Sequence, residues 1–188
     1  MLRVISGSAG GLKLKTIKGM TTRPTTDKVK GSIFNIIVSR LEGACVLDLF
    51  AGTGSLGIEA LSRGAEKAFF FDKSPECCKV IKENLVHTRL ADRAEVFAAD
   101  FAAGLGRLYA GGEKFDLVLL DPPYNKNFIQ DTLKILMNND IIRDDGILVA
   151  EHSISDSLPE TCGRLEAVDS RKYGDTAITI YIARKKEQ

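Results

Sequence analysis

The sequence predicts an α/β protein built on a mostly parallel sheet with helices on both faces. Continuous apolar runs, typical of buried parallel strands, alternate with helical or loop segments. The runs lie at 45–50, 67–72, 94–100, 115–121 and 146–152. A glycine-rich turn, AGTGSLG, follows the first of these runs. The last two runs, 165–173 and 176–184, are joined only by Gly174 and Asp175, so we expect an antiparallel hairpin at the end of the sheet.

The residues before the first of these strands predict a hairpin followed by a helix. RVIS (3–6) and LKLKTI (12–17) are short alternating runs divided by a glycine-rich turn. From Asp27, apolar residues recur at helical spacing as far as Leu41, and Thr26 or Asp27 can cap the start. We therefore divide the chain into an N-terminal extension, 1–42, and a main domain, 43–188.

Two further helices are indicated by their end signals. LGIEALSR, directly after the glycine-rich turn, has helical character and ends at Gly64, a residue suited to a helix C-terminus. Ser74 and Pro75 supply a cap and a first-turn proline for a helix that follows the second strand.

The composition is that of an ordinary globular protein. The chain has 188 residues, 44% of them apolar and 27% charged, and no apolar run approaches the length of a membrane span or of a secretory signal. We expect a cytoplasmic protein. Its four cysteines lack zinc-site spacing, so we expect reduced, structural thiols and no metal: Cys45, Cys77, Cys78 and Cys162.

Positive charge is concentrated at the start of the chain. The first 43 residues hold eight Lys or Arg against two acids, a net of +6, which leaves −5 for the remainder of a chain whose total is +1. A basic extension on a mildly acidic body fits a polyanionic partner, and it equally fits a solvated lysine face. Charge alone does not choose between them.

Aspartates stand at three successive strand ends. Asp72, Asp100 and Asp121 close the second, third and fourth predicted strands, while Asp48 lies inside the first. In a parallel sheet, the carboxyl ends of the strands border the ligand crevice. Three acids there indicate a binding site.

The glycine-rich turn matches two kinds of cofactor site. Gly52, Gly54 and Gly57 fit the G-x-G-x-x-G pattern of dinucleotide binding, or simply a tight strand-to-helix turn. Asp48, however, suits a ligand that carries positive charge better than it suits a pyrophosphate. S-adenosylmethionine (AdoMet) combines an ammonium and a sulfonium with a carboxylate for the helix N-terminus, so the acid favours AdoMet.

Within this interpretation each acid has an expected partner. Asp72 is placed for the ribose hydroxyls and Asp100 for the adenine amino group, with Phe101 available to stack on the ring. The expected cofactor-binding residues are Asp48, Phe50, Ala51, Gly52, Thr53, Gly54, Asp72, Lys73, Asp100 and Phe101.

The sequence DPPY, at 121–124, suits methylation of an exocyclic amine on a nucleic-acid base. Such an amine attacks only when its lone pair points at the methyl donor, which requires acceptors for both N–H bonds. Asp121 offers a carboxylate and Pro122 a carbonyl, while neither Pro122 nor Pro123 has an N–H to compete. The carboxylate also stabilises charge that develops on nitrogen, and Tyr124 can stack on the base.

These motifs together resemble the class I AdoMet-dependent methyltransferases. RVISGSAGG, RPTTDKVKGSIFN, DLFAGTGSLGIEALSRGA and FDLVLLDPPY are similar, more narrowly, to the bacterial 16S rRNA guanine-N2 methyltransferase family called ribosomal RNA small-subunit methyltransferase D. The resemblance implies a Rossmann-like fold with a seven-stranded sheet. It also implies AdoMet as cofactor and a guanine of 16S rRNA in the small ribosomal subunit as substrate.

The alternatives differ in what they need from the sequence. In related enzymes Asp at position 121 goes with adenine N6 as well as guanine N2, so an adenine-N6 DNA methyltransferase without a recognition domain is the second hypothesis. An NAD-binding oxidoreductase is more distant, since Asp48 disfavours it and no hydride-transfer set is evident. A small-molecule amine methyltransferase would need neither DPPY nor the basic extension, and a non-catalytic RNA-binding module would not need DPPY.

The basic extension is the expected RNA contact, and we expect a monomer. Phosphate contacts position a nucleic acid without reading its sequence, so the shape of the folded rRNA would supply specificity. In related enzymes the segment before the first strand also lines the methionine end of AdoMet, so residues 23–26 can serve the cofactor instead. The expected nucleic-acid-binding residues are Lys13, Lys15, Lys18, Arg23 and Lys126.

Overall fold

A computed structural model gives the fold and describes residues 2–17, 26–122 and 128–186, except for the side chains of residues 101 and 107. The helices are α1 (Asp27–Ile36), α2 (Ser55–Ser62), α3 (Pro75–Thr88), α4 (Phe101–Ala110) and α5 (Phe128–Asn139), with 3₁₀ turns η1 (Val38–Arg40) and η2 (Ala91–Arg93). The strands are β1 (Cys45–Leu49), β2 (Lys67–Asp72), β3 (Ala94–Ala98), β4 (Phe115–Leu120), β5 (Ile142–Ser153), β6 (Thr161–Cys162), β7 (Leu165–Tyr173) and β8 (Thr176–Ala183).

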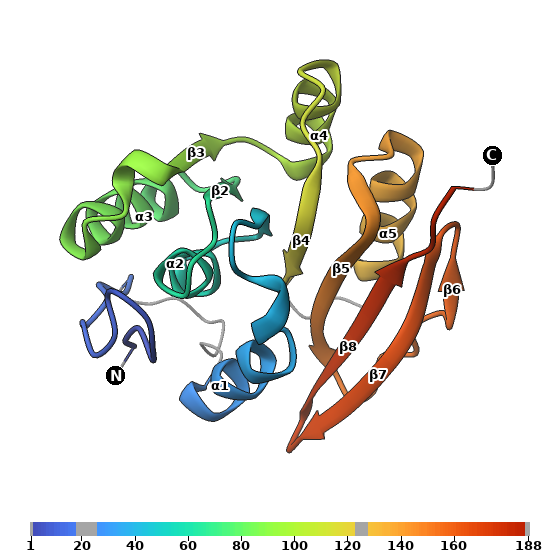
Figure 1. The fold of residues 1–188 in the computed structure, drawn as a ribbon, viewed down its shortest axis with the longest axis horizontal. Helices are drawn as coiled ribbons and strands as arrows, with labels where there is room; N and C mark the ends of the chain where they lie inside the picture. The colour runs from blue at the N-terminus through green and yellow to red at the C-terminus, as the bar shows by residue number, and fades with distance from the viewer. Residues whose placement is uncertain (1, 18–25, 123–127, 187–188) are drawn as a thin grey trace.

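One twisted sheet runs through the molecule in the order β3-β2-β1-β4-β5-β8-β7-β6 (Figure 1). The first five strands in this order are parallel, and β8 lies antiparallel between β5 and β7. Strand β7 therefore runs in the same direction as β5. Consequently β1 to β5 and β7 all end at one edge of the sheet, which we call the carboxyl edge.

Helices cover both faces of the sheet (Figure 1). On one face, α1, α2 and α3 bury side chains such as Phe34, Ile58 and Ile81 against the strands. On the other face, α4 and α5 bury Leu105 and Leu133. The α/β class and the terminal antiparallel hairpin expected from the sequence are thus confirmed.

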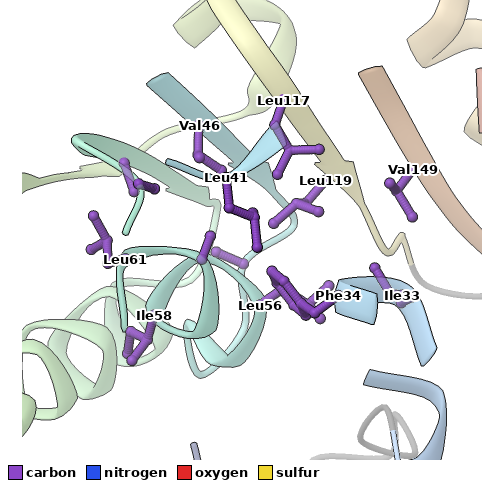
Figure 2. Packing of buried hydrophobic residues seen from close by; sticks show 14 of the residues in the cluster. Ile33, Phe34, Leu41, Val46, Leu56, Ile58, Leu61, Leu117, Leu119 and Val149 are labelled. Carbon is purple, nitrogen blue, oxygen red and sulfur yellow. The ribbon is translucent and has the colours of Figure 1, made fainter. Parts of the chain in front are cut away.

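The core under α1 and α2 joins the N-terminal extension to the main domain. Side chains of α1, β1 and β4 meet there with Leu41, which follows η1; Phe34, Val46 and Leu119 are among them (Figure 2). The same cluster continues through Leu2, Val4, Ala9 and Leu14 of the extension. Burial of this apolar surface stabilises the packing by about 25 cal/mol for each Å² removed from water.

The local helix signals are confirmed by the capping geometry. Thr26 Oγ1 accepts from the Val29 N–H at 3.3 Å at the start of α1. Ser74 caps α3 by accepting from the Cys77 N–H at 3.3 Å, with Pro75 in the first turn. Each cap satisfies a backbone donor that the helix itself leaves free.

Several strands differ from the sequence prediction: β1, β4 and β8 end one residue earlier than expected, and β6, β5 and β3 differ more. The sheet has an eighth strand, β6, whose two residues are too few to show a periodic pattern. Strand β5 begins at Ile142 rather than at Gly146, across a register shift in its pairing with β4. Strand β3 ends at Ala98, because Asp100 turns its carboxylate to the Ala102 N–H at the start of α4, at 3.0 Å.

The predicted N-terminal hairpin is reduced to one antiparallel bridge between Arg3 and Lys13 within residues 2–17. The bonds from Val4 N–H to the Leu12 carbonyl (2.9 Å) and from Leu14 N–H to the Leu2 carbonyl (3.0 Å) flank that bridge. Beyond Val4 the chain turns to α2 instead of continuing a ladder.

Candidate active site at the carboxyl edge

The glycine-rich turn connects β1 to α2 at the carboxyl edge. Phe50, Gly52 and Gly54 all have positive φ, at 61°, 56° and 78°, which is the left-handed region that glycine enters without cost. The Ala51 N–H donates to the Phe71 carbonyl at 2.9 Å, so the turn bends back over the end of β2. This brings the turn and the acid that closes β2 together.

Asp72 holds two separate loops at once. Its Oδ2 accepts from the Gly52 N–H at 2.9 Å, and its Oδ1 accepts from the Ser74 N–H at 2.8 Å. The carboxylate is partly exposed. A carboxylate oxygen can accept a second hydrogen bond, so each oxygen of Asp72 keeps acceptor capacity for a ligand hydroxyl.

Asp48 is buried against α2. It is 2% exposed, and its Oδ2 accepts from the Gly57 N–H at 2.8 Å, a donor in the first turn of the helix. A negative charge is favourable at this end of a helix. Burial nevertheless raises the pKa of Asp48 from 3.8 to about 7. The hydrogen bond from Gly57 opposes this rise, whereas the nearby charge of Asp72 adds to it.

Gly57 allows α2 to approach the sheet closely. A Cβ at this position would lie 2.3 Å from a ring carbon of Phe70 and 3.0 Å from the Asp48 carboxylate. The third glycine of the motif therefore has a packing role that the sequence pattern alone did not separate from ligand binding.

The acid expected to bind the adenine amino group lies next along the edge. Asp100 is exposed and caps α4, and Lys73 is exposed beside Asp72. Phe50 packs edge-to-face on Phe128 of α5, with ring centroids 5.3 Å apart. The Phe101 side chain is outside the described part of the chain.

Asp121 and Pro122 directly follow β4, beside the glycine-rich turn. The register pairs Leu120 with Leu49, so the residues after each strand, Asp121 and Phe50, are neighbours at the carboxyl edge. Asp121 is partly exposed and Pro122 is buried. Pro123 and Tyr124, the remainder of the motif, lie outside the described residues.

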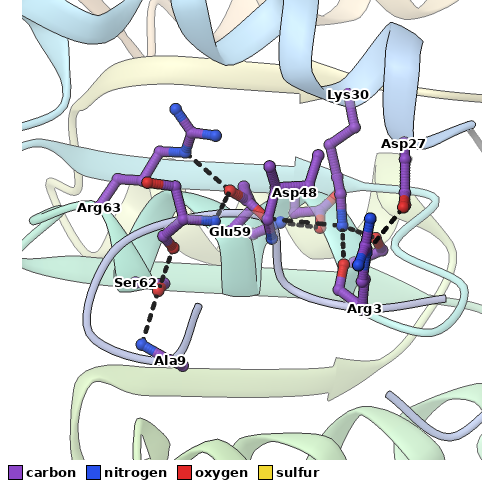
Figure 3. Close-up of polar contacts among 12 residues, drawn as sticks. Arg3, Ala9, Asp27, Lys30, Asp48, Glu59, Ser62 and Arg63 are labelled. Atoms are coloured by element: carbon purple, nitrogen blue, oxygen red, sulfur yellow. Dashed lines mark hydrogen bonds and ion pairs between the residues drawn. The ribbon is translucent and has the colours of Figure 1, made fainter. Parts of the chain in front are cut away.

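A buried polar network, which the sequence reading missed, fastens the extension to α2 (Figure 3). Glu59 accepts from the N–H groups of Ile5 at 2.7 Å and Ser6 at 3.0 Å. Its carboxylate also receives Arg63 Nε at 2.7 Å and lies 3.5 Å from Lys30 Nζ. Lys30 and Glu59 are both 0% exposed.

Lys30 also bonds outside this ion pair. Its Nζ donates to the Arg3 carbonyl and, at 3.0 Å, to Ser55 Oγ at the start of α2. Burial lowers the pKa of Lys30, an effect that Glu59 opposes. The charge of Lys30 is thus internal, and it does not contribute to a basic surface as the charge count of the extension had assumed.

Asn84 of α3 joins the extension to the glycine-rich turn. This fully buried amide accepts from the Lys15 N–H at 2.7 Å and donates to the carbonyls of Lys15 at 3.2 Å and Thr53 at 2.9 Å. The sequence offered no signal for it, because an Asn in a charged helix is indistinguishable from a surface residue.

The expected nucleic-acid contacts are only partly visible. Lys13 and Lys15 are exposed, and Lys15 Nζ forms an ion pair with Glu83 at 2.9 Å. Lys18, Arg23 and Lys126 lie outside the described residues.

A family model described as "Conserved hypothetical protein 95" matches residues 2–182. The chain belongs to this family. It is 42% identical to "Putative rRNA methyltransferase YlbH" of Bacillus subtilis, over 96% of this chain and 98% of that protein. It is 29% identical to "Ribosomal RNA small subunit methyltransferase D" of Escherichia coli, over 96% of this chain and 89% of that protein.

A solved structure agrees with this membership of the conserved hypothetical protein 95 family. "Putative methyltransferase yhhF from Escherichia coli" superposes with a TM-score of 0.87 at 29% identity, covering 98% of this chain and 99% of that one. The resemblance to ribosomal RNA small-subunit methyltransferase D expected from the sequence is therefore confirmed.

The described part of this family member has neither a membrane-spanning helix nor a cluster of metal-ligating side chains. Across residues 2–17, 26–122 and 128–186, no helix is both long and apolar enough to span a bilayer. In the same ranges, no three His, Cys, Asp or Glu side chains are grouped as metal ligands would be. All four cysteines are free thiols.

Proposed function

We propose that this protein transfers a methyl group from AdoMet to the exocyclic N2 amine of a guanine in 16S rRNA of the small ribosomal subunit. The observation that carries the proposal is the position of Asp121 and Pro122 at the end of β4, next to the glycine-rich turn after β1. Membership of a family whose curated relatives are named as rRNA methyltransferases supports the RNA substrate.

The residues at the carboxyl edge fit AdoMet. Asp72 already fixes the turn through Gly52 and keeps acceptor capacity for ribose hydroxyls, while Asp100 is exposed for the adenine amine. The turn between β1 and α2 brings backbone close to the ligand. AdoMet, when bound, supplies an electrophilic methyl on a sulfonium.

Asp48 has a different place in this proposal from the one its sequence position suggested. Its carboxylate faces the first turn of α2 and is 2% exposed, so its geometry suits support of the turn. When it is ionised, its charge lies near the ligand end of that helix and favours a cationic methionine group over a pyrophosphate.

Asp121 and Pro122 supply the acceptors that the amine requires. The Asp121 carboxylate and the Pro122 carbonyl accept the two N–H bonds, which turns the nitrogen lone pair toward the methyl group. Asp121 also stabilises the positive charge that builds on the nitrogen as the new N–C bond replaces the bond between methyl and sulfur, and the nitrogen then releases one proton. Alignment of amine and methyl contributes much of the remaining rate.

A polar groove next to this edge suits the backbone of the substrate RNA. It has a volume of about 510 Å³ and lies between α1 and β7, with Lys28, Ser32, Asn35 and Arg171 among its lining residues. Contact between the Ser32 and Tyr173 hydroxyls places it at the end of β7, hence at the carboxyl edge. Cations and hydroxyls of this kind bind phosphate and sugar.

The test combines labelled AdoMet with three substrates: naked 16S rRNA, small subunits from cells that lack this activity, and undermethylated DNA. We expect label in N2-methylguanosine of the small subunit. Asp121→Ala should abolish turnover and leave AdoMet affinity nearly unchanged. The control is Asp92→Ala, which replaces an exposed acid in η2, before the start of β3, and should behave as wild type. Label in N6-methyladenine of DNA would refute the proposed substrate.

A further inference from the structure

Glu151 is a buried carboxylate at the carboxyl edge that none of the roles above uses. It is 5% exposed and lies near the end of β5. Its backbone is fixed by antiparallel pairing with Ile178 of β8. A buried carboxylate at the ligand-facing edge of a parallel sheet, one strand away from the proposed catalytic acid, is a candidate for a functional residue.

The strand register places Glu151 beside Asp121. Leu120 of β4 pairs with Ala150 of β5, so the next residue on each strand forms the adjacent row. Leu120 and Ala150 both pack on the α4–α5 face. Because side chains alternate along a strand, Glu151 belongs to the opposite face, on the side of α1. Asp121, the first residue after β4, lies in the same row.

Two neighbouring carboxylates select a ligand edge that carries only donors. Guanine offers N1–H beside the N2 amine along its Watson–Crick edge. Adenine and cytosine instead place an unprotonated ring nitrogen, an acceptor, beside their exocyclic amines. A carboxylate accepts hydrogen bonds and repels another acceptor, so the pair of acids fits guanine alone among these bases.

We propose that Glu151 is the residue that specifies guanine, by accepting the N1–H while Asp121 and Pro122 hold the N2 amine. This inference rests on the proposed function and adds to it the discrimination between guanine and other amine-bearing bases. Glu151 touches the base but takes no part in methyl transfer.

The decisive experiment compares guanine with 2-aminopurine, which keeps the amine at C2 but has an acceptor at N1. Small subunits are reconstituted around 16S rRNA that carries either base at the nucleotide mapped with the wild-type enzyme. We expect wild type to prefer guanine by at least tenfold in kcat/KM, because a site built for a donor leaves its acceptor unpaired against the analogue. Glu151→Gln should bring the ratio close to one, since an amide can accept from N1–H or donate to N1.

Controls separate this result from simple loss of fold. Glu160→Gln, an exposed acid on the connection after β5, should keep the wild-type ratio. Glu151→Asp retains an acceptor at a shorter reach and should give an intermediate ratio. Melting temperature and AdoMet affinity are measured for each variant.

The outcomes distinguish the two levels of the proposal. A Glu151→Gln enzyme that retains the wild-type preference overturns the role of Glu151 and leaves the proposed function standing. If both Glu151 variants fail to fold, Glu151 has a structural role in the core, and the proposed role in guanine recognition is overturned. Failure of the wild type to methylate guanine-bearing subunits refutes the proposed function itself.

Discussion

Replacing Glu59 by Gln should destabilise the whole protein, although the residue lies outside the proposed active site. The carboxylate receives donors from Ile5, Ser6 and Arg63 and lies 3.5 Å from Lys30 Nζ. Both members of the Lys30–Glu59 pair are 0% exposed. The substitution therefore leaves a buried ammonium without its counterion.

The expected loss follows from that geometry. Breaking a buried ion pair from one side costs about 3–5 kcal/mol, because the remaining charge stays in a poorly solvated site. A domain of this kind has a total stability of about 5–15 kcal/mol, so the loss is a large fraction of it. Lys30→Met should cost less, about 1–3 kcal/mol, since Ile5, Ser6 and Arg63 still compensate Glu59.

The double variant is the informative one. With Lys30→Met and Glu59→Gln together, the buried ammonium is gone, and only Arg63, whose side chain is 10% exposed, loses a charged partner. The double variant should therefore be more stable than the sum of the two single losses predicts. We expect a coupling of about 1–3 kcal/mol, in the range found for residues in direct contact. Glu66→Gln, an exposed acid just beyond α2, is the matched control and should change stability by about 0.5 kcal/mol or less.

Urea-induced unfolding, followed by circular dichroism, measures these free energies, and its pH dependence adds a second check. Burial lowers the pKa of Lys30, so the unfolded chain binds more protons between that pKa and 10.5, and stability rises with pH in this window. Loss of Glu59 lowers the Lys30 pKa further, so the deficit of Glu59→Gln should shrink as the pH is raised. Strictly additive losses, or a Glu59→Gln loss below about 1 kcal/mol, would refute this account of the network.

Three further predictions concern the candidate site. Asp48 has its pKa raised from 3.8 to about 7, so wild-type stability should fall as the pH rises through this window. Asp48→Asn should remove that fall and gain up to about 4 kcal/mol above pH 7, at about 1.4 kcal/mol for each pKa unit. Gly57→Ala should cost about 1–3 kcal/mol by overpacking, because its Cβ would meet Phe70 at 2.3 Å. Gly106→Ala, with nothing within 4 Å in α4, should instead stabilise by about 0.5–1 kcal/mol. Asp72→Ala should weaken AdoMet binding at least tenfold by equilibrium dialysis, since it frees the turn at Gly52 and removes a ribose acceptor.

Each of these has a result that would count against it. Parallel melting profiles for wild type and Asp48→Asn between pH 4 and 8 would place that carboxylate in contact with water. Equal stability of the two alanine variants would show that α2 is not in close contact with the sheet at Gly57. An Asp72→Ala enzyme with wild-type AdoMet affinity but lost turnover would move Asp72 from cofactor binding to catalysis.

The strands were predictable because buried parallel strands leave a direct signal. KAFFFD, at 67–72, is a continuous apolar run and forms β2 with those bounds. The run predicted at 115–121 forms β4, which ends one residue earlier, at Leu120. The hairpin at 165–173 and 176–183 was marked by its short connection. The two residues of β6 gave no such signal, because their pairing depends on where β7 lies.

The N-terminal extension was predicted less well because its partners are distant in sequence. Glu59 takes the N–H groups of Ile5 and Ser6 that a hairpin ladder would have used, across more than fifty residues. Lys30 reads as surface charge until the fold places it opposite Glu59. Asp48 illustrates the same limit at the site, since its position predicts an acid near the ligand and only the fold gives its bond to Gly57.

The position of β8 has a consequence for how the protein is made. Residues 176–183 come late in the chain, yet they lie inside the sheet, between β5 and β7. Until they emerge from the ribosome, the backbone of β5 has no partner on that side and is open to pairing with another chain. Translation from Ser153 to Ala183 takes roughly 1.5–6 s at ~5–20 residues per second, and during this interval the uncovered side of β5 favours aggregation unless another chain or a chaperone covers it.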